Sequence, residues 1–457
     1  MQTFSTTSQP WQEVLDRLPP DLDLDALAFS SGALKRRREV GDGTTLLRLA
    51  MARGPGGLSL NQTAAWAAMQ GLAQLSDPAV KYRLDQAVPF LKALLEQQLA
   101  ERAGGPPICW PGRSLRLVDG SHISQPGSKG SDWLVHAGYD LGGGGFFHLE
   151  LTDKYGAESL LRGALLPGEV RVGDRNFANA KGLHSLRVQS HNQADFIVRA
   201  GWKAFALSQA DGTAFDLIAH LRALPRDQQP HEVAVQAQVD KTTHLPLRLI
   251  ILRFSPEETA KIHKRLRRRA QRDRKKLDPR TLVAAEFLIL ATSLPAELYP
   301  AEEVLAAYRL RWQIELAFKR LKSLARFAEL RARDPRLARA WLLAHLIAAV
   351  LIETSLGEGL DSPPWAAGIR RATPAQPVAR LAGGASAPAT RPVHHRASAD
   401  QSRHARRCRA PPQRGATTAQ IPGLGGQICA ILAPMGQRPL VGVRGETPIL
   451  VDSPDQA

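Results

Sequence analysis

Cysteine is nearly absent from this chain of 457 residues. Its three cysteines, Cys109, Cys408 and Cys429, lie far apart and form no Cys-x-x-Cys pair. Because zinc ribbons and disulfide frameworks need closely spaced cysteines, neither is expected here. The scarcity of cysteine fits a reducing cell interior, where disulfides are rare. We therefore expect a cytoplasmic protein.

The sequence also lacks a recognisable membrane segment. Residues 1–11 are polar, with no basic stretch followed by an apolar one, so no signal peptide is expected. The most apolar run, residues 340–352, is shorter than the roughly 20 residues that span a bilayer, and it contains His345. We interpret this run as a buried helix and expect no membrane partner.

Acidic residues are scarce relative to basic ones. Lys and Arg number 60 against 43 Asp and Glu, which gives a formal net charge of +17 and a sequence pI near 10.3. A field of that sign favours a polyanionic partner, with nucleic acid first and an anionic membrane surface second. A basic soluble protein without such a partner is the simpler alternative. The hydrophobic fraction of 44% is ordinary for a globular protein.

Residues 1–105 have the pattern of short helices with tight breaks. Ser59 is placed to cap a helix, and Ser76-Asp77-Pro78 is placed to begin another, with proline in its first turn. A basic cluster occupies residues 35–38. Such a segment is compatible with a DNA-binding helical domain, although many helical bundles share the pattern.

From about residue 113 the pattern changes to strands. Residues 114–119 and 169–174 each predict a strand that ends in an aspartate. Between and after them, the sequence predicts strands at 136–141, 146–151 and 196–199 and helices at 159–165 and 178–189. This order is typical of an α/β layer fold of the ribonuclease H type, whose first part would cover residues 106–200.

Residues 201–300 interrupt that fold with further strand-like runs. The runs lie at 231–239, 247–254 and 287–292. Residues 261–276 contain ten Lys or Arg and predict a strongly basic helix. A solvated helix is the simplest interpretation, but in a DNA-processing enzyme we favour contact with the DNA backbone, which would weaken steeply with salt. The segment is therefore predicted to be a β-rich insertion with a basic arm.

Residues 301–358 predict two helices, at 302–328 and 335–355. On the first helix, Tyr308, Arg311, Glu315 and Lys322 project along one stripe, because their offsets are three, seven and fourteen residues. The other side is apolar, with Leu310, Ile314, Ala317, Leu321 and Leu324. A solvated charged face with an Arg311–Glu315 pair would produce the same spacing.

Three carboxylates predict a metal site only when they are considered together. Asp119 and Asp174 each follow a hydrophobic strand, where α/β sheets place functional groups, although each alone is more often a turn or cap residue. If their strands are adjacent, Glu315 can reach them from its helix. Converging carboxylates repel without cations, and hard oxygen ligands select Mg²⁺ or Mn²⁺. Two such ions can activate a water or a 3′-hydroxyl and stabilise the leaving oxygen of a phosphodiester.

Three sequence motifs carry a family resemblance. The segments 118–121 (Val-Asp-Gly-Ser), 172–177 (Val-Gly-Asp-Arg-Asn-Phe) and Tyr308-x2-Arg311-x3-Glu315-x6-Lys322 resemble the motif regions of insertion-sequence DDE transposases. They are similar in particular to the insertion-sequence-four family, with its Tyr-Arg-Glu-Lys signature, over roughly residues 30–355. The resemblance implies a ribonuclease H-like catalytic core interrupted by a β-rich insertion.

The same resemblance implies roles for single residues. Asp119, Asp174 and Glu315 would be catalytic and would ligate two Mg²⁺ ions, with Mn²⁺ as a possible substitute. DNA would be contacted by Tyr308, Arg311, Lys322 and Arg175. Some members form a hairpin intermediate and receive a flipped base on a tryptophan of the insertion. Trp202 is the only tryptophan in residues 201–300, but we do not count it among the site residues.

The resemblance also implies an activity and partners. Members cut DNA at the ends of their element and join the freed 3′-hydroxyls to target DNA. The expected partners are double-stranded DNA, as terminal inverted repeats and as target, and a second copy of the chain on paired ends. The expected location is the bacterial cytoplasm, at the nucleoid.

The last hundred residues depart from the family pattern. Residues 359–457 are rich in Pro, Ala, Arg and Gly without periodicity, which predicts a low-complexity, disordered tail. A reading-frame shift near residues 363–364 is one hypothesis, and translation of the other two frames tests it. Two rival functions stay open: a non-catalytic protein that occupies transposon ends, and a stand-alone metal nuclease of the same fold.

Overall fold

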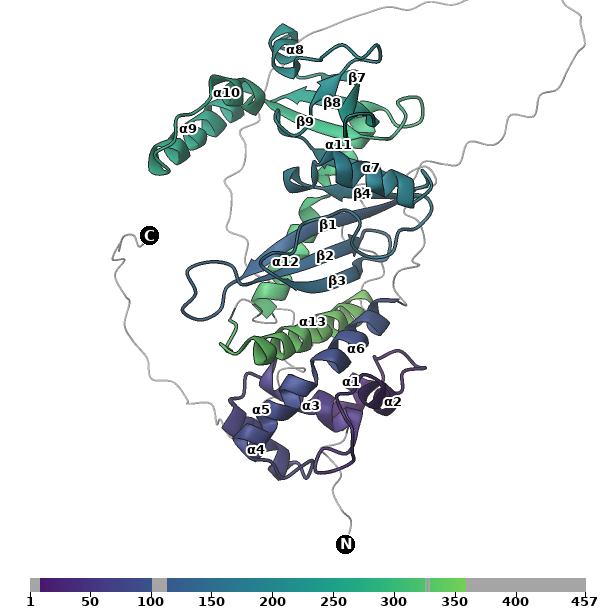
Figure 1. Ribbon diagram of the computed structural model, residues 1–457, viewed down its shortest axis with the longest axis vertical. Coiled ribbons are helices and arrows are strands. Elements are labelled where there is room, and N and C mark those ends of the chain that lie inside the picture. Colours follow the sequence, from purple (N-terminus) through teal and green to yellow (C-terminus); the bar gives the residue numbers. More distant parts are fainter. Residues whose placement is uncertain (1–8, 101–112, 325–326, 328, 359–457) are drawn as a thin grey trace, which may run out of the picture.

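The computed structural model describes residues 9–100, 113–324, 327 and 329–358 (Figure 1). The three cysteines and the predicted tail at 359–457 lie outside the described residues, and so does the hypothesis of a shifted reading frame. In Figure 1 the N-terminal helices form one end of the molecule, and the segment of residues 207–292 forms the other.

The N-terminal segment is helical, as predicted. Its helices are α1 (Gln9–Leu15), α2 (Leu24–Ser30), α3 (Gly43–Arg53), α4 (Leu60–Met69), α5 (Asp77–Gln86) and α6 (Val88–Ala100). The predicted cap at Ser59 is confirmed, because its side chain and that of Gln62 form a reciprocal capping box before α4. Proline stands in the first turn of α5, where its missing N–H costs nothing.

Five strands form a ribonuclease H-like sheet, which confirms the predicted fold class. They are β1 (Ser114–Ile123), β2 (Trp133–Asp140), β3 (Gly145–Asp153), β4 (Glu169–Gly173) and β5 (Asp195–Arg199), in the order β3-β2-β1-β4-β5. The first three are antiparallel neighbours, whereas β4 and β5 run parallel to β1. The short 3-10 helix η1 (Arg175–Phe177) and α7 (Ala180–Gln189) connect β4 to β5.

The predicted insertion strands extend this sheet. They are β6 (Leu207–Ser208), β7 (Pro230–Gln238), β8 (His244–Arg253) and β9 (Phe287–Thr292), and β9 pairs antiparallel with β5. All nine strands therefore form one sheet, which continues from β5 as β9-β8-β7-β6. The segment also contains α8 (Leu217–Ala223), α9 (Pro256–Arg272) and α10 (Pro279–Ala285). The division into domains at residues 105, 200, 300 and 358 stays a prediction.

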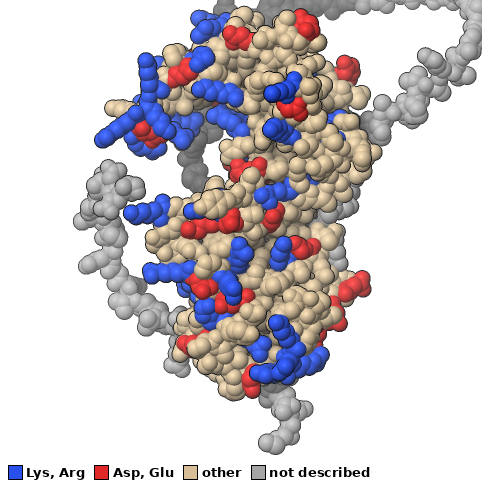
Figure 2. Space-filling model, viewed as in Figure 1, with Lys and Arg blue, Asp and Glu red and all other residues tan. Residues whose placement is uncertain are grey.

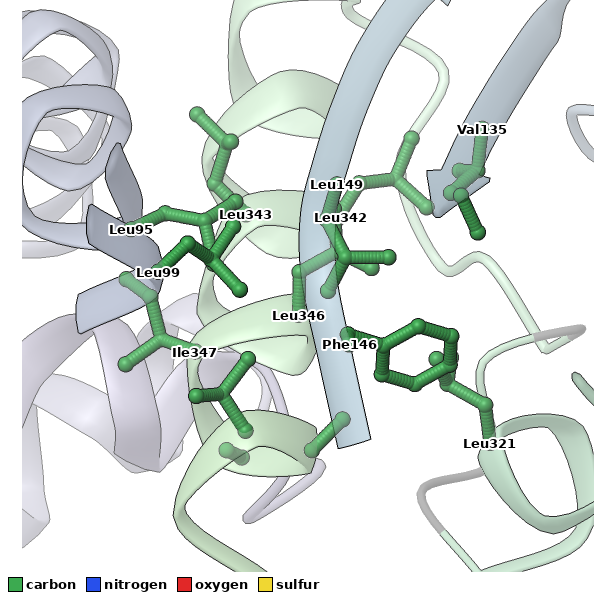
Figure 3. Close-up of a cluster of buried hydrophobic side chains, with 14 of the residues drawn as sticks. Leu95, Leu99, Val135, Phe146, Leu149, Leu321, Leu342, Leu343, Leu346 and Ile347 are labelled. Atoms are coloured by element: carbon green, nitrogen blue, oxygen red, sulfur yellow. The ribbon is translucent and has the colours of Figure 1, made fainter. Parts of the chain in front are cut away.

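Helix α13 (Pro335–Glu358) joins the N-terminal helices to the sheet. In Figure 3, leucines of α6 meet Leu343 and Ile347 of α13, while Phe146 and Leu149 of β3 approach the same helix. Residues 335–353 are long and apolar enough to cross a membrane, with a mean hydropathy of 1.5, but 78% of that window is buried inside the protein. The predicted buried helix is confirmed. Our argument that it was too short was wrong, because α13 is longer than the apolar run.

The predicted helix at 159–165 was wrong, because this segment forms turns. Its backbone carbonyl groups face the buried guanidinium of Arg171, so they are not available for the hydrogen bonds of a helix. Arg171 donates hydrogen bonds to the carbonyl oxygens of Leu160, Arg162, Gly163 and Ala164. Gly163 adopts a φ of 77°, which L-residues disfavour. A side chain from the following strand, β4, therefore takes the backbone groups that a helix would have used.

The predicted continuous helix at 302–328 was also wrong. It is divided into α11 (Ala301–Arg309) and α12 (Trp312–Leu324) by a turn at residues 310–311. Tight hydrogen bonds mark the turn, from the N–H groups of Leu310 and Arg311 to the carbonyls three residues earlier. No proline or glycine stands at this turn to predict it from the sequence. Helix α11 packs on β5 and β7, whereas α12 packs on β1, so packing sets the change of direction.

Candidate active site

Asp119 and Asp174 stand at the same level of two neighbouring strands. Strands β1 and β4 pair in parallel, with Leu117 opposite Val172. Each aspartate follows two residues later in its own chain, so both lie at the carboxyl end of this ladder. Asp174 comes directly after β4 and accepts a hydrogen bond of 2.8 Å from the N–H of Asn176. The structure thus brings the two predicted aspartates together.

The prediction that Asp119 ends its strand was wrong. Strand β1 continues to residue 123, because β2 pairs with it along its other edge, with Asp119 opposite Ala137. The pairing with β4 ends at Leu117. Asp119 therefore lies inside a strand, but at the point where the parallel neighbour has ended and one edge of β1 is open.

The carboxyl group of Asp119 is largely buried, with 18% of its side chain exposed. One oxygen accepts a hydrogen bond of 2.8 Å from the N–H of Gly120. Burial raises the pKa of Asp119 to about 6, against the lowering effects of Gly120 and Arg311. The negative charges of Asp174 and Glu158 contribute to the rise. Several carboxylates thus share one small region, which costs free energy unless cations neutralise them.

Arg311 joins Asp119 to Glu315. Its guanidinium lies 3.7 Å from Asp119 Oδ2 and donates a hydrogen bond to Glu315 Oε1. Arg311 lies in the turn between α11 and α12, and Glu315 lies in the first turn of α12. The i,i+4 pair predicted from spacing is therefore present, but its arginine also reaches a strand of the sheet.

Tyr308 lies among cationic side chains beside Asp174. Burial raises the pKa of its phenol, Arg311 and Arg199 lower it, and Asp174 raises it. These effects place Tyr308 among both arginines and Asp174. Arg175, predicted to contact DNA, is exposed and follows Asp174 directly.

Sequence reasoning missed Arg199. It is the last residue of β5, the strand beside β4, and it is half-buried. Burial lowers its pKa, and so do the positive charges of Arg175, Arg311 and Arg265. The signal that could have found it is its position, because Arg199 ends a strand beside the one that Asp174 follows.

An open cavity of about 460 Å³ lies beside Asp119 and Glu315. Its lining also includes Lys322, so three of the predicted site residues meet there. The remaining lining residues are Gly120, Ser121, Phe318 and Lys319. Asp174, Tyr308 and Arg175 do not line this cavity. The predicted residues therefore form two adjoining groups that Asp119 and Arg311 connect.

Sequence reasoning also missed Glu158, a carboxylate beside Asp119. It lies between β3 and β4, and a Cβ at position 120 would overlap its Oε1 atom. The same segment is held by Arg171, which pairs with Glu169 at 2.7 Å. Glu169 in turn pairs with Arg116 at 3.2 Å, and all three of these side chains are buried. Arg171 thus fixes the loop that places Glu158 beside Asp119. This position depends on the fold and could not be predicted from the sequence.

The three predicted ligands have the chemistry that a hard cation prefers, but in this structure they do not lie close enough together to hold one. Asp119, Asp174 and Glu315 supply the carboxylate oxygens that Mg²⁺ and Mn²⁺ prefer. Yet no three His, Cys, Asp or Glu side chains within the described ranges come close enough together to hold a metal ion. Arg311 occupies oxygens of both Asp119 and Glu315, so these carboxylates would have to exchange its guanidinium for a cation.

The basic helix of the insertion ends earlier than predicted. Helix α9 stops at Arg272, so seven of the ten predicted Lys and Arg residues lie on it and three follow it. Trp202 lies in the turn after β5, and its Nε1 atom donates a hydrogen bond of 3.2 Å to Thr281 Oγ1 in α10. The cations of Arg280 and Lys203 each lie 4.6 Å from the centre of its ring. Trp202 thus anchors α10.

Comparison with known proteins gives a family match. The model of the family described as transposase DDE domain matches residues 110–351. The transposase for insertion sequence element IS421 from Escherichia coli is 41% identical over 362 residues, which make up 78% of this chain and 97% of that protein. The InsL protein for insertion sequence element IS186A from Escherichia coli K12 is 41% identical over 361 residues, with the same coverage.

Two further similarities are more distant. The transposase for insertion sequence element IS231F from Bacillus thuringiensis subsp. israelensis is 25% identical over 313 residues, or 60% of this chain and 64% of that protein. A cryo-EM structure of the piggyBac transposase synaptic complex with hairpin DNA aligns with 8% identity and a TM-score of 0.38. That alignment covers 80% of this chain and 68% of the other, and so slight a likeness carries no argument.

Proposed function

The chain belongs to the DDE transposase family, and from that premise we propose that it cleaves DNA strands at the ends of an insertion sequence and joins the freed 3′-hydroxyls to target DNA. Its function as an insertion-sequence transposase follows from the family. The strand chemistry is our inference, and one observation supports it above others. Asp119 and Asp174 each lie two residues beyond the last pair of the parallel β1–β4 ladder, while Asp119 and Glu315 share one cavity.

We assign the metal to the three carboxylates. Asp119, Asp174 and Glu315 would hold two Mg²⁺ ions, with Mn²⁺ as a substitute. When bound, such ions activate the attacking hydroxyl and stabilise the leaving oxygen of a phosphodiester. The burial of Asp119 beside the carboxylates of Asp174 and Glu158 favours this role, because that crowding is costly without cations.

The cationic side chains would position the DNA. Tyr308 lies beside Asp174, Arg175 follows Asp174, Arg311 lies beside Asp119, and Lys322 lines the cavity with Glu315. Guanidinium groups bind phosphate oxygens through paired hydrogen bonds, so Arg311 and Arg175 suit the scissile strand. We add Arg199 to this group, because its half-buried cation lies near the same tyrosine. These contacts fix the register of a strand without reading its bases.

The proposal also specifies partners and place. The substrates would be double-stranded DNA, as the terminal inverted repeats of the element and as target DNA. Two copies of the chain would act on paired ends, in the bacterial cytoplasm at the nucleoid. The net charge of +17 favours such a polyanionic substrate.

A strand-transfer assay tests this function against its rivals. The full chain is incubated with Mg²⁺ and a duplex that carries the element's terminal inverted repeats. End-specific cleavage followed by strand joining supports the proposal. Binding without cleavage indicates an end-occupying protein, and unspecific cutting indicates a metal nuclease.

Single substitutions link that activity to the carboxylates. Asp119→Asn, Asp174→Asn and Glu315→Gln keep the size of each side chain and should each abolish cleavage, while binding of the end duplex is retained. Glu329→Gln is the matched control, because Glu329 is exposed and lies outside both groups. Full cleavage by any of the three carboxylate variants contradicts the assignment of that residue.

A further inference from the structure

Helix α9 carries six basic side chains on one face, which we name the α9 stripe. They line a shared open groove, and each lies three or four residues from another member: Lys261, Lys264, Arg265, Arg268, Arg269 and Arg272. With a rise of about 1.5 Å per residue, the stripe is about 16 Å long. Figure 2 shows the blue side chains gathered over this helix, which Figure 1 shows projecting to one side of the sheet.

The charges of the α9 stripe are not balanced within the helix. No acidic residue lies between Thr259 and Arg272. Asp273, after the helix, pairs with Arg269 at 3.6 Å and with Arg272 at 3.2 Å. The other four members, Lys261, Lys264, Arg265 and Arg268, form no ion pair within the described part of the chain. Like charges at i,i+4 destabilise a helix, so this arrangement suits an external anion.

Helix α9 is stable despite this repulsion because interactions at both of its ends stabilise it. Ser255 and Glu258 form a reciprocal capping box, and proline occupies the first turn. Two glutamates in the first turn and two arginines in the last turn complement the helix dipole. The chain therefore maintains α9 as a helix and keeps its cations in a row.

The opposite face of α9 is already occupied. Ile262 and Leu266 are half-buried on that side, and the helix packs on α10. His263 forms a hydrogen bond of 2.9 Å with the carbonyl of Leu282 in α10. A membrane-surface helix needs a free apolar face to enter the lipid, so a polyanion in solution fits α9 better.

The α9 stripe lies near the candidate active site. Arg265 is close enough for its charge to lower the pKa of Arg199, which lies beside Tyr308 and Arg311. Helix α10 is also attached near Arg199, because Trp202 follows Arg199 by three residues and donates a hydrogen bond to α10. Positive charges thus lie both at the end of β5, at Arg199, and nearby on α9, at Arg265.

We propose that the α9 stripe binds the phosphate backbone of the DNA segment engaged at the candidate active site, whatever its base sequence. This inference rests on the proposed function only in that the site acts on DNA. Lys and Arg contacts to phosphates add affinity and set orientation but carry no sequence information. The row spans about four phosphate spacings of one strand, at about 3.4 Å of duplex axis per phosphate.

Two triple variants of the full chain test the proposal. The first removes three stripe charges through Lys264→Gln, Arg265→Gln and Arg268→Gln. The matched control removes three charges off the stripe through Arg267→Gln, Lys275→Gln and Lys276→Gln. Both are titrated with a duplex of arbitrary sequence at several NaCl concentrations without divalent metal, after circular dichroism has shown unchanged helix content.

The expected result is a change in salt dependence. Each lost phosphate contact lowers the slope of log K against log salt by about one, so the stripe variant should lose about two to three from the slope while the control keeps it. Equal slopes in both variants, or a stripe variant that binds as the wild type does, overturn the proposal.

Two further measurements distinguish this proposal from lipid binding by the α9 stripe and from the proposed function of the chain. If the stripe variant loses binding to vesicles of anionic phospholipid but keeps its DNA binding, the stripe recognises lipid and the proposal falls. The proposed function fails separately, if the wild-type chain binds end DNA but never cleaves it with Mg²⁺. In that case a salt-slope difference between the two variants still supports the α9 stripe.

Discussion

The guanidinium of Arg311 lies 3.7 Å from Asp119 and at the same time holds Glu315 by a hydrogen bond. These two carboxylates come from a strand and a helix almost two hundred residues apart in the sequence. One arginine therefore neutralises two groups that we assign to metal binding, and it competes with any cation for their oxygens. That competition can be measured.

Replacement of Arg311 by glutamine should tighten the binding of Mn²⁺ to the free protein. Because exposed or half-exposed ion pairs contribute about 1 kcal/mol or less, we expect a gain of a few-fold in affinity. Titration followed by electron paramagnetic resonance measures it without any turnover. Arg175→Gln is the control, since Arg175 forms no ion pair within the described residues. Weaker Mn²⁺ binding by Arg311→Gln than by wild type would contradict the competition.

Replacement of Gly120 by alanine should act through Glu158. The new Cβ would overlap Glu158 Oε1, which is the end of a flexible side chain and can move away. We expect the fold to be kept, with a stability loss of about 1 kcal/mol or less, and DNA cleavage to fall. A cycle with Glu158→Ala tests the cause, because the effect of Gly120→Ala should shrink when Glu158 is already truncated. Equal effects in both backgrounds would show that Glu158 is not involved.

Replacement of Arg171 by leucine should destabilise the whole protein. The buried carboxylate of Glu169 would lose its partner at 2.7 Å, and four loop carbonyls would lose their donor. Removing one member of a buried pair costs about 3–5 kcal/mol. Urea unfolding measures it, and adding Glu169→Gln should recover part of the loss. Arg162→Ala, at a more exposed position, should cost much less.

His345 should make the protein sensitive to acid. Burial lowers the pKa of its imidazole to about 3, against 6.5 as the ordinary value. Between these pH values the unfolded chain binds more protons than the native one, so stability falls as the pH drops below 6.5. The contribution between pH 7 and pH 5 is about 2 kcal/mol.

Urea unfolding at pH 7 and pH 5 tests this effect with His345→Leu. The variant should lose less stability than wild type over that interval. Part of the sensitivity will remain, because burial also lowers the pKa of His136, to about 4. Identical losses in wild type and variant would exclude His345 as a source.

Much of the fold could be predicted from local pattern. The strands at 114–119, 231–239 and 287–292 alternate or run apolar as half-buried and buried strands do, and each is present in the structure. The cap at Ser59 depends on residues three apart, so the sequence contains all of it. The order of the three site motifs likewise needs no structure, because it is linear. The roles of the predicted site residues stay predictions.

Only the tertiary structure decided the rest. The sequence contains Arg171 and the segment at 159–165 but does not show that one takes the hydrogen bonds of the other. Nor does it show that β9 pairs with β5 and makes the insertion part of one sheet. Periodicity reports which face of an element is apolar, whereas register and partner choice depend on residues far away in the chain. For that reason the spacing of Arg311 and Glu315 determined their pairing, but only the fold brought Asp119 and Arg199 to Arg311, and Glu158 to Asp119.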